Sequence, residues 1–274
     1  MKLEIIILII GILLVFVCTT LGSAFVYFIK GDVSKKMNQI FMGFAAGVML
    51  SASFFSLLLP ASEISISYMP NVLVIALATI LGALFMWGID KLIPHLHPLQ
   101  NQEEGLSRPN MSKTGKMFLA VTIHNVPEGL SVGIAFGVAL ATIKINSLSN
   151  NSEIFNVLLP ALMLSIGIGI QNIPEGAVVS LPMKSETNSK HKAFLFGTLS
   201  GAVEPVAALL GLFLALQIEA IMPWALAFAA GCMIYVVAEE MIPDMQGEPT
   251  SHHGVWSFIF GFVLMMVLDL MEFF

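Results

Sequence analysis

Two six-residue segments inside apolar sequence carry the side chains best suited to chemistry. His124–Gly129 reads HNVPEG and Gln171–Gly176 reads QNIPEG. Each segment begins with a side chain that can bind metal and has a glutamate, Glu128 or Glu175, four residues later. Because four residues make about one helical turn, the two side chains of each segment would lie on one helix face. Two such faces in apolar sequence predict a cation site.

Each segment also places a proline, Pro127 or Pro174, in the middle of a predicted membrane span. Proline has no N–H, so the carbonyl four residues earlier, on Ile123 or Ile170, loses its helical partner. In lipid such a carbonyl must find another partner or line a polar cavity. One kinked helix with one buried glutamate is often purely structural, but two matching copies favour function. We therefore expect kinked, interrupted helices four and five around a cation site.

The composition is that of an integral membrane protein. Of the 274 residues, 57% are hydrophobic and 11% are charged, whereas about a quarter of a soluble domain is charged. The net charge of -6 identifies no partner. Nucleic acid is excluded as a partner because there is no basic patch with interleaved aromatic residues. Cys18 and Cys232 fall inside apolar spans, where cysteine behaves as a small hydrophobic residue, so we expect neither a disulfide nor a thiolate site.

Eight apolar segments are long enough to cross a bilayer, which takes about 20 helical residues. The first, within residues 1–29, imitates a signal peptide, but its apolar run is too long for one, so we interpret it as a retained span. The others are 38–59, 71–93, 117–140, 155–181, 193–216, 223–243 and 255–273. We expect an all-α integral membrane protein, an eight-helix bundle forming one transmembrane transporter domain over residues 1–274.

Basic residues in the loops predict the orientation of these spans. Ten Lys and Arg residues surround the loops after spans one, three and five, against only Lys2 and Lys144 on the opposite side. The positive-inside rule then puts both termini outside. The longest cytoplasmic loop, 94–116, is predicted to be mobile and carries His95 and His97, which are either plain solvated residues or weak metal ligands. Short loops and few basic residues favour a bacterial inner membrane.

The predicted topology brings the ligand-type side chains to a common depth. Counted from the cytoplasmic span ends, His124 and Glu175 lie roughly 10 Å deep, and Glu128 and Gln171 roughly 15 to 16 Å deep. Glu204 in span six also lies roughly 16 Å deep. It is either a residue of a proline-associated helix kink or a third carboxylate of the site, and the shared depth favours the site.

Three buried carboxylates need a neutralising partner, and these spans contain no Lys or Arg. The carboxylates are therefore either protonated or neutralised by a divalent cation. A ligand set of imidazole, carboxylate and amide oxygen, without thiolate, suits Zn²⁺, Fe²⁺ or Mn²⁺. Three glutamates carry enough charge for two adjacent metal ions.

At these residues the chain resembles the ZIP (Zrt/Irt-like protein) family of divalent-metal transporters, in particular prokaryotic members with a binuclear-like site. The resemblance covers the spans, the His-containing loop, the paired signatures and Glu239–Asp244 (EEMIPD), which is similar to the family's acidic-Ile-Pro-acidic ending. It implies a first metal site of His124, Glu128, Gln171 and Glu175, and a second completed by Asn125, Asn172 and Glu204 and bridged through Glu128 and Glu175. Many members have His in place of Gln171, so we expect a broader metal range than zinc alone.

Other polar side chains near these spans are left open as metal ligands. Ser53 either hydrogen-bonds its own backbone, as serines in membrane helices do, or reaches the first site. Glu239 and Glu240 either are solvated at the end of span seven or, together with His95 and His97, take up metal on the exit path.

The resemblance implies a transporter rather than an enzyme. It would carry zinc, and also iron, manganese, cadmium or cobalt, into the cytoplasm by alternating access, with the metal as substrate and no prosthetic group. The family's elevator-like motion would move spans one, four, five and six. Its partners would be divalent metal ions and the lipid bilayer, and a homodimer is left open.

Three rival functions would use the same buried ligands. A metal-dependent intramembrane protease needs two histidines four residues apart beside a glutamate, and no span holds a second histidine. Two similar, proline-containing segments near the midplane are better explained by a transporter than by a cation channel. A metal sensor that does not transport is also left open.

Overall fold

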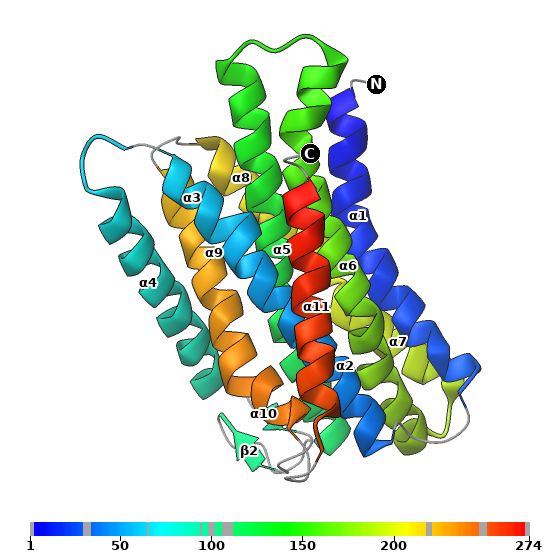
Figure 1. The fold of residues 1–274 in the computed structure, drawn as a ribbon. Coiled ribbons are helices and arrows are strands. Elements are labelled where there is room, and N and C mark those ends of the chain that lie inside the picture. Colours follow the sequence, from blue (N-terminus) through cyan, green and yellow to red (C-terminus); the bar gives the residue numbers. More distant parts are fainter. Residues whose placement is uncertain are drawn as a thin grey trace.

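The computed structural model describes residues 3–29, 34–64, 66–93, 95–97, 102–105, 112–217, 221–246 and 251–271. These residues form a bundle of long helices (Figure 1), and eight helical stretches within them are long and apolar enough to cross a membrane. The helical segments are α1 (Leu3–Ser23), η1 (Ala24–Tyr27), α2 (Lys35–Ala52), η2 (Ser53–Leu58), α3 (Leu59–Glu63), α4 (Asn71–Leu92), α5 (Lys113–Ile145), α6 (Asn151–Thr187), α7 (Lys190–Gly201), α8 (Val203–Gln217), α9 (Met222–Val236), η4 (Val237–Met241), α10 (Ile242–Met245) and α11 (His253–Leu270). The predicted all-α, eight-span architecture is confirmed.

The spans correspond to these segments in chain order. Span one comprises α1 and η1, span two α2 to α3, span three α4, span four α5, span five α6, span six α7 and α8, span seven α9 to α10, and span eight α11. Both termini lie toward the end of the bundle that holds the connection between α5 and α6 (Figure 1). Following the charge distribution, we call this the outer end and the opposite one the inner end.

At the inner end, part of the predicted mobile loop forms a small hairpin. Strand β1 (His95–His97) pairs antiparallel with β2 (Gln102–Glu104), with His95 opposite Glu104. The side chains of these strands, together with residues 94, 98–101 and 106–111, lie outside the described residues, as does the side chain of Lys113. The structure therefore places the backbone of His95 and His97 but says nothing of their ligands.

Helices α5 and α6 are longer than the hydrophobic pattern predicts. They contain 33 and 37 residues, which at 1.5 Å per residue is about 50 and 56 Å, well beyond a hydrocarbon core of about 30 Å. Side chains cap their starts: Ser112 accepts from the Gly115 N–H at 3.1 Å, and Asn150 from the Ser152 N–H at 3.1 Å. Their outer ends stand above the neighbouring helices (Figure 1).

Neither of these helices is interrupted at its signature proline. α5 continues through Pro127, and α6 continues through Pro160, Pro174 and Pro182. The expected interruption of spans four and five is therefore wrong. Each proline removes one hydrogen bond, but the flanking turns are held by the helices packed around them, so the helical path continues.

The interruptions lie instead in spans two, six and seven. Segments η2 and η4 are π-helical, and each leads into a short helix with a proline in its first turn, Pro60 or Pro243. A wider turn relieves the clash between a proline ring and the carbonyl four residues earlier. In span six, α7 ends at Gly201 and α8 begins at Val203, which puts Glu204 in the first turn of α8.

Close backbone contacts divide the bundle into two groups of helices. We call α1, η1, α5, α6, α7 and α8 unit A, and α2, η2, α3, α4, α9, η4, α10 and α11 unit B. An added Cβ would come within 2.1 Å of a facing backbone oxygen at Gly22 (α1 against α6), Gly133 (α5 against α8), Gly47 (α2 against α11) and Gly82 (α4 against α9). Such tight helix packing is typical of membrane proteins.

The two units meet through side chains instead. Among the described glycines, every approach under 3.0 Å to the backbone of another helix joins helices of the same unit. Gly167 on α6 does face the other unit, but a Cβ there would meet only the side chain of Met265 on α11, at 2.0 Å from its sulfur. Glycine therefore allows close backbone packing within each unit.

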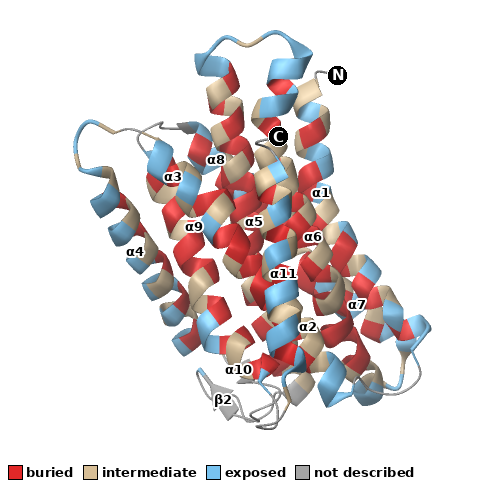
Figure 2. Ribbon diagram, viewed as in Figure 1, coloured by how far each residue is buried: buried red, intermediate tan, exposed pale blue. Residues whose placement is uncertain are grey.

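Buried residues concentrate in the interior of the bundle, while the outward sides of α4 and α11 are largely exposed (Figure 2). The exposed positions include large apolar side chains such as Val72, 71% exposed, and Trp256, 69% exposed. Such surfaces are expected in lipid, because lipid tails are as apolar as these side chains and no hydrophobic effect favours burying them.

Candidate metal site

The two signature segments meet in the interior of unit A. The Gln171 side-chain Nε2 donates hydrogen bonds to Glu128 Oε1 at 2.6 Å and to Glu175 Oε1 at 3.5 Å. Glu128 and Gln171 are fully buried and Glu175 is 5% exposed. One amide group thus lies between the two signature carboxylates, and the common depth predicted for these side chains is matched by direct contacts.

Glu204 joins the same network from α8. Asn172 Nδ2 donates to Glu204 Oε1 at 3.0 Å, and Gln171 Nε2 donates to Asn172 Oδ1 at 3.0 Å. The second asparagine, Asn125, is also fully buried and donates from Nδ2 to the carbonyl oxygen of Ser200 at 2.9 Å. We call the residues Asn125, Glu128, Gln171, Asn172, Glu175 and Glu204 the buried network.

Five oxygen atoms of this network have no hydrogen-bond partner among the described residues. They are Asn125 Oδ1, Glu128 Oε2, Gln171 Oε1, Glu175 Oε2 and Glu204 Oε2. Each buried polar atom without a partner costs about 1–3 kcal/mol, and native proteins tolerate few of them. All five are acceptors, and three belong to carboxylates. A cation would satisfy such a group of oxygens, whereas a hydrogen-bond acceptor would not.

His124 has a different partner from the one that the spacing predicts. Its Nε2 lies 2.5 Å from Glu240 Oε1 on η4, in unit B. His124, Glu175, Glu240 and Asp244 also line a cavity of about 40 Å³ on the inner side of the network. The structure therefore brings His124 together with Glu240 on the inner side, at the boundary between the units.

The predicted ligands do not form a closed metal-binding cluster in this arrangement. Within the described residues, no three His, Cys, Asp or Glu side chains are grouped so that they could hold a metal ion. Two contacts account for this: the Gln171 amide lies between Glu128 and Glu175, and His124 is turned toward Glu240. A bound cation requires these side chains to rearrange.

The remaining predicted ligands are placed as follows. Ser53, in η2, is buried and donates from Oγ to the carbonyl oxygen of Met49 at 2.7 Å, the local backbone bond usual for serine in membrane helices. Glu239 is exposed, and its neighbour Glu240 is buried against His124. Only Glu240 of this pair contacts a residue predicted for the first site.

One polar residue of the site was missed from the sequence. Thr19 on α1 is fully buried, and its Oγ1 donates to Glu204 Oε1 at 2.7 Å. A lone threonine in an apolar span carries no signal of function by its type or spacing. A possible signal was the adjacent pair Thr19 and Thr20, two hydroxyls deep in a span that is otherwise almost entirely apolar.

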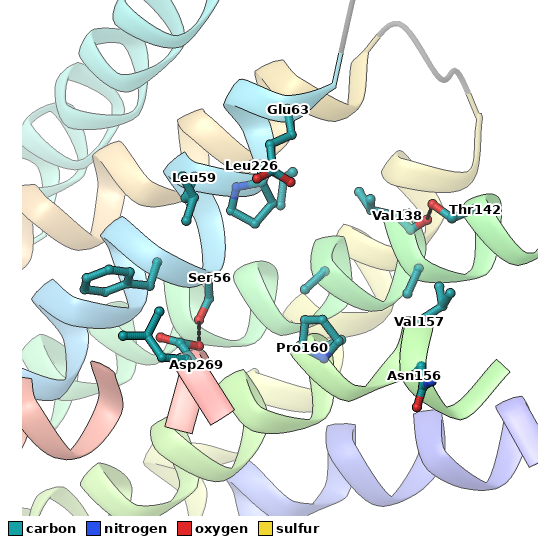
Figure 3. Close-up of a pocket in the computed structure, with 16 residues that line it drawn as sticks. Ser56, Leu59, Glu63, Val138, Thr142, Asn156, Val157, Pro160, Leu226 and Asp269 are labelled. Atoms are coloured by element: carbon teal, nitrogen blue, oxygen red, sulfur yellow. Dashed lines mark hydrogen bonds between the residues drawn. The ribbon is translucent and has the colours of Figure 1, made fainter. Parts of the chain in front are cut away.

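A larger cavity of about 460 Å³ lies on the outer side, lined by α5, α6, α9, α11 and span two. Figure 3 shows Ser56 and Asp269 pointing toward each other, and Ser56 Oγ donates to Asp269 Oδ1 at 2.6 Å. Along α5 and α6, the turns between this cavity's lining residues and the buried network carry fully buried side chains. Some are apolar, including Val132, Leu164 and Ile168, and two are serines, Ser131 and Ser165.

A bundle of membrane-spanning helices in two units, with unpartnered acceptor oxygens midway and a cavity toward each end, defines a membrane transporter for cations. Residues 116–269 match the family described as "ZIP Zinc transporter", and the chain belongs to this ZIP family. The zinc transporter ZIP11 of Homo sapiens is 32% identical over 92% of this chain and 93% of its own length. The zinc transporter GufA of Myxococcus xanthus is 33% identical over 88% and 90%. The zinc transporter ZIPB of Bordetella bronchiseptica is 30% identical over 93% and 77%.

Proposed function

We propose that the protein transports divalent metal ions into the cytoplasm and that the buried network is its transport site. The observation that carries this proposal is the group of five unpartnered acceptor oxygens, three of them from carboxylates. A divalent ion supplies the positive charge that the apolar segments 117–140, 155–181 and 193–216 lack, since they contain no Lys or Arg. The relatives named as zinc transporters support zinc as a substrate. The amide of Gln171, a harder and weaker ligand than imidazole, supports the acceptance of iron, manganese, cadmium or cobalt as well. The metal is the substrate, and the protein is a transporter and not an enzyme.

The ligands divide between two adjacent positions. Glu128, Gln171 and Glu175 form the first, and His124 completes it after leaving Glu240. Asn125, Asn172 and Glu204 complete the second, with Glu128 and Glu175 shared between the two. The unpartnered Oε1 of Gln171 and Oδ1 of Asn125 are the amide oxygens that would bind metal. The Gln171 NH₂ group lies between the two carboxylates that would share the ion.

Metal would reach and leave this site by alternating access. Metal would enter from the outer cavity and, on leaving inward, pass the small cavity beside His124, Glu240 and Asp244. All residues of the buried network belong to unit A, whereas Glu240 belongs to unit B. Because each unit is tightly packed internally and meets the other through side chains, we infer that unit A slides as one body against unit B.

A pair of engineered cross-links tests this motion. A Cβ at Gly167 would lie 3.7 Å from Met265 Cγ across the unit boundary, and the sulfur of a cysteine at 265 would take the place of this Cγ. A Cβ at Gly169 would lie 3.7 Å from Cys18 Cβ within unit A, within the Cβ separation of about 3.5–4.5 Å that disulfides have. In a background without native cysteines, oxidised Gly167→Cys/Met265→Cys should lose uptake and regain it after reduction. The control is Gly169→Cys in a background that keeps Cys18 and lacks Cys232. After oxidation has joined residues 18 and 169 within unit A, this protein should transport normally. Unchanged uptake across a fully formed Gly167–Met265 cross-link would contradict motion between the units.

The identity of residue 171 should set the range of transported metals. An amide oxygen is a harder and weaker ligand than imidazole, so Gln171→His should increase the preference for Zn²⁺ over Mn²⁺ about tenfold. The measurement is the ratio of kcat/KM for the two metals in proteoliposomes, with Gln171→Ala as the variant that supplies no ligand. If the ratio is the same in wild type and Gln171→His, residue 171 does not contact the metal during transport.

The proposed function itself is tested by uptake of Zn²⁺, Fe²⁺, Mn²⁺ and Cd²⁺ into proteoliposomes that contain the purified protein. Saturable uptake of at least one metal is expected, because each protein has a fixed number of transport sites and the rate stops rising when all of them are occupied. Flux that rises in proportion to metal concentration would indicate a channel instead. Absence of any metal-dependent uptake by correctly folded protein would overturn the proposal.

A further inference from the structure

Thr19 makes the closest contact that Glu204 has with another side chain. Thr19 Oγ1 donates to Glu204 Oε1 at 2.7 Å, and Asn172 Nδ2 donates to Thr19 Oγ1 at 3.1 Å and to Glu204 Oε1 at 3.0 Å. The hydroxyl also lies 3.2 Å from the Val15 carbonyl oxygen. Since the hydroxyl has one proton, the shorter bond to the carboxylate is the favoured one.

Close packing fixes the position of this threonine. A Cβ added at Gly176 on α6 would lie 2.1 Å from the Thr19 carbonyl oxygen, and one at Gly201 on α7 would lie 2.8 Å from Thr19 Cβ and Cγ2. The absence of side chains at both glycines lets α6 and α7 press against Thr19 from two directions. The hydroxyl is therefore held at one point relative to α8, where Glu204 stands.

The two carboxylate oxygens of Glu204 differ in their hydrogen bonds. Oε1 accepts from both Thr19 and Asn172, whereas Oε2 is buried without a partner among the described residues. With Oε1 held by two donors, the carboxylate cannot rotate freely, and Oε2 is presented toward the interior. Glu204 also stands in the first turn of α8.

We propose that Thr19 is a positioning residue for the second metal position: it orients Glu204 so that Oε2 is available to the ion. The inference rests on the proposed function, because it assumes that Glu204 binds transported metal. It also gives α1 a role in the site, through the contacts of Thr19 with Glu204 and Asn172.

Matched substitutions test this role by counting bound metal. Thr19→Val keeps the shape that packs between the glycines and removes the hydroxyl, whereas Thr19→Ser keeps the hydroxyl. The control is Thr20→Val, because Thr20 Oγ1 has no hydrogen-bond partner within the described part of the chain. Binding of Zn²⁺ and Cd²⁺ to purified protein is measured by equilibrium dialysis with elemental analysis, after thermal unfolding has confirmed that each variant is folded.

We expect Thr19→Val to weaken binding of the second ion about 10- to 100-fold, as removal of a group that orients a ligand typically does. The first ion should bind as in wild type. Thr19→Ser should restore the second ion to within about threefold of wild type, since its hydroxyl can make the same bond. Thr20→Val should bind both ions normally.

A double-mutant cycle separates positioning from general damage. If Thr19 acts only through Glu204, Thr19→Val should have no further effect on metal binding in a Glu204→Gln background. An effect that persists in that background overturns the inference, as does wild-type binding of the second ion by Thr19→Val. If instead wild type binds one ion and Glu204→Gln does not alter its binding, the second metal position of the proposed function fails, and the role of Thr19 with it.

Discussion

Glu128→Gln is expected to reduce saturable Zn²⁺ uptake into proteoliposomes about 100-fold or more, because a direct ligand should matter more than the groups that orient it. Glu128 is fully buried, its Oε1 accepts from Gln171, and its Oε2 has no partner among the described residues. The substitution preserves the shape of the side chain and removes the negative charge that the two proposed metal positions share. The loss should appear in both kcat and KM, since the charge is needed to bind the ion and to carry it.

The matched control for this variant is Glu153→Gln. Glu153 lies in the first turn of α6 and is exposed, at the outer end and far along the helix from the buried network. It should transport at the wild-type rate. If Glu128→Gln is folded and transports as fast as Glu153→Gln, the buried network is not the transport site, even if the protein transports metal by another route.

Gly22→Ala is expected to lower the free energy of unfolding by about 3 kcal/mol, near the upper end of the usual cost of overpacking. An added Cβ would lie 1.9 Å from the Ile173 carbonyl oxygen on α6. This neighbour is backbone within a helix, so the contact is relieved only if α1 and α6 move apart. The movement would also separate Thr19 from Gly176, where a Cβ would lie 2.1 Å from the Thr19 oxygen. Thermal unfolding in detergent, followed by circular dichroism, measures the loss.

Gly88→Ala provides the comparison, since a Cβ at Gly88 on α4 would meet no atom within 4 Å. Alanine there should be neutral or raise the free energy of unfolding by about 0.5–1 kcal/mol, because glycine loses more conformational freedom in a helix. Equal melting temperatures for the Gly22→Ala and Gly88→Ala proteins would mean that α1 and α6 are not in the close contact described.

The number and order of the spans, and the segments that meet in the buried network, could be predicted from the sequence. Hydrophobic length identifies a membrane helix without knowledge of its neighbours, and the four-residue spacing within HNVPEG and QNIPEG places side chains on a face by helix geometry alone. The lengths of α5 and α6 were underestimated because polar ends such as Lys113–Lys116 and Lys144 lower the hydropathy although the helices continue through them.

The effect of the prolines on spans four and five was predicted wrongly. A proline predicts a lost hydrogen bond, but whether the helix breaks depends on the packing around it. α5 and α6 continue through their prolines, whereas spans two and seven widen into π-helical turns ahead of Pro60 and Pro243. Local sequence does not distinguish these two outcomes.

The sequence by itself determined the class of this protein and the residues of its buried network, because both depend on hydrophobicity and on spacing along single helices. The tertiary structure alone decided which side chains meet: His124 with Glu240 rather than with Glu128, and Thr19 with Glu204. These pairs lie 116 and 185 residues apart in the chain. Their contacts depend on how separate helices pack and on which way each side chain turns, and neither is encoded in the pattern of one segment.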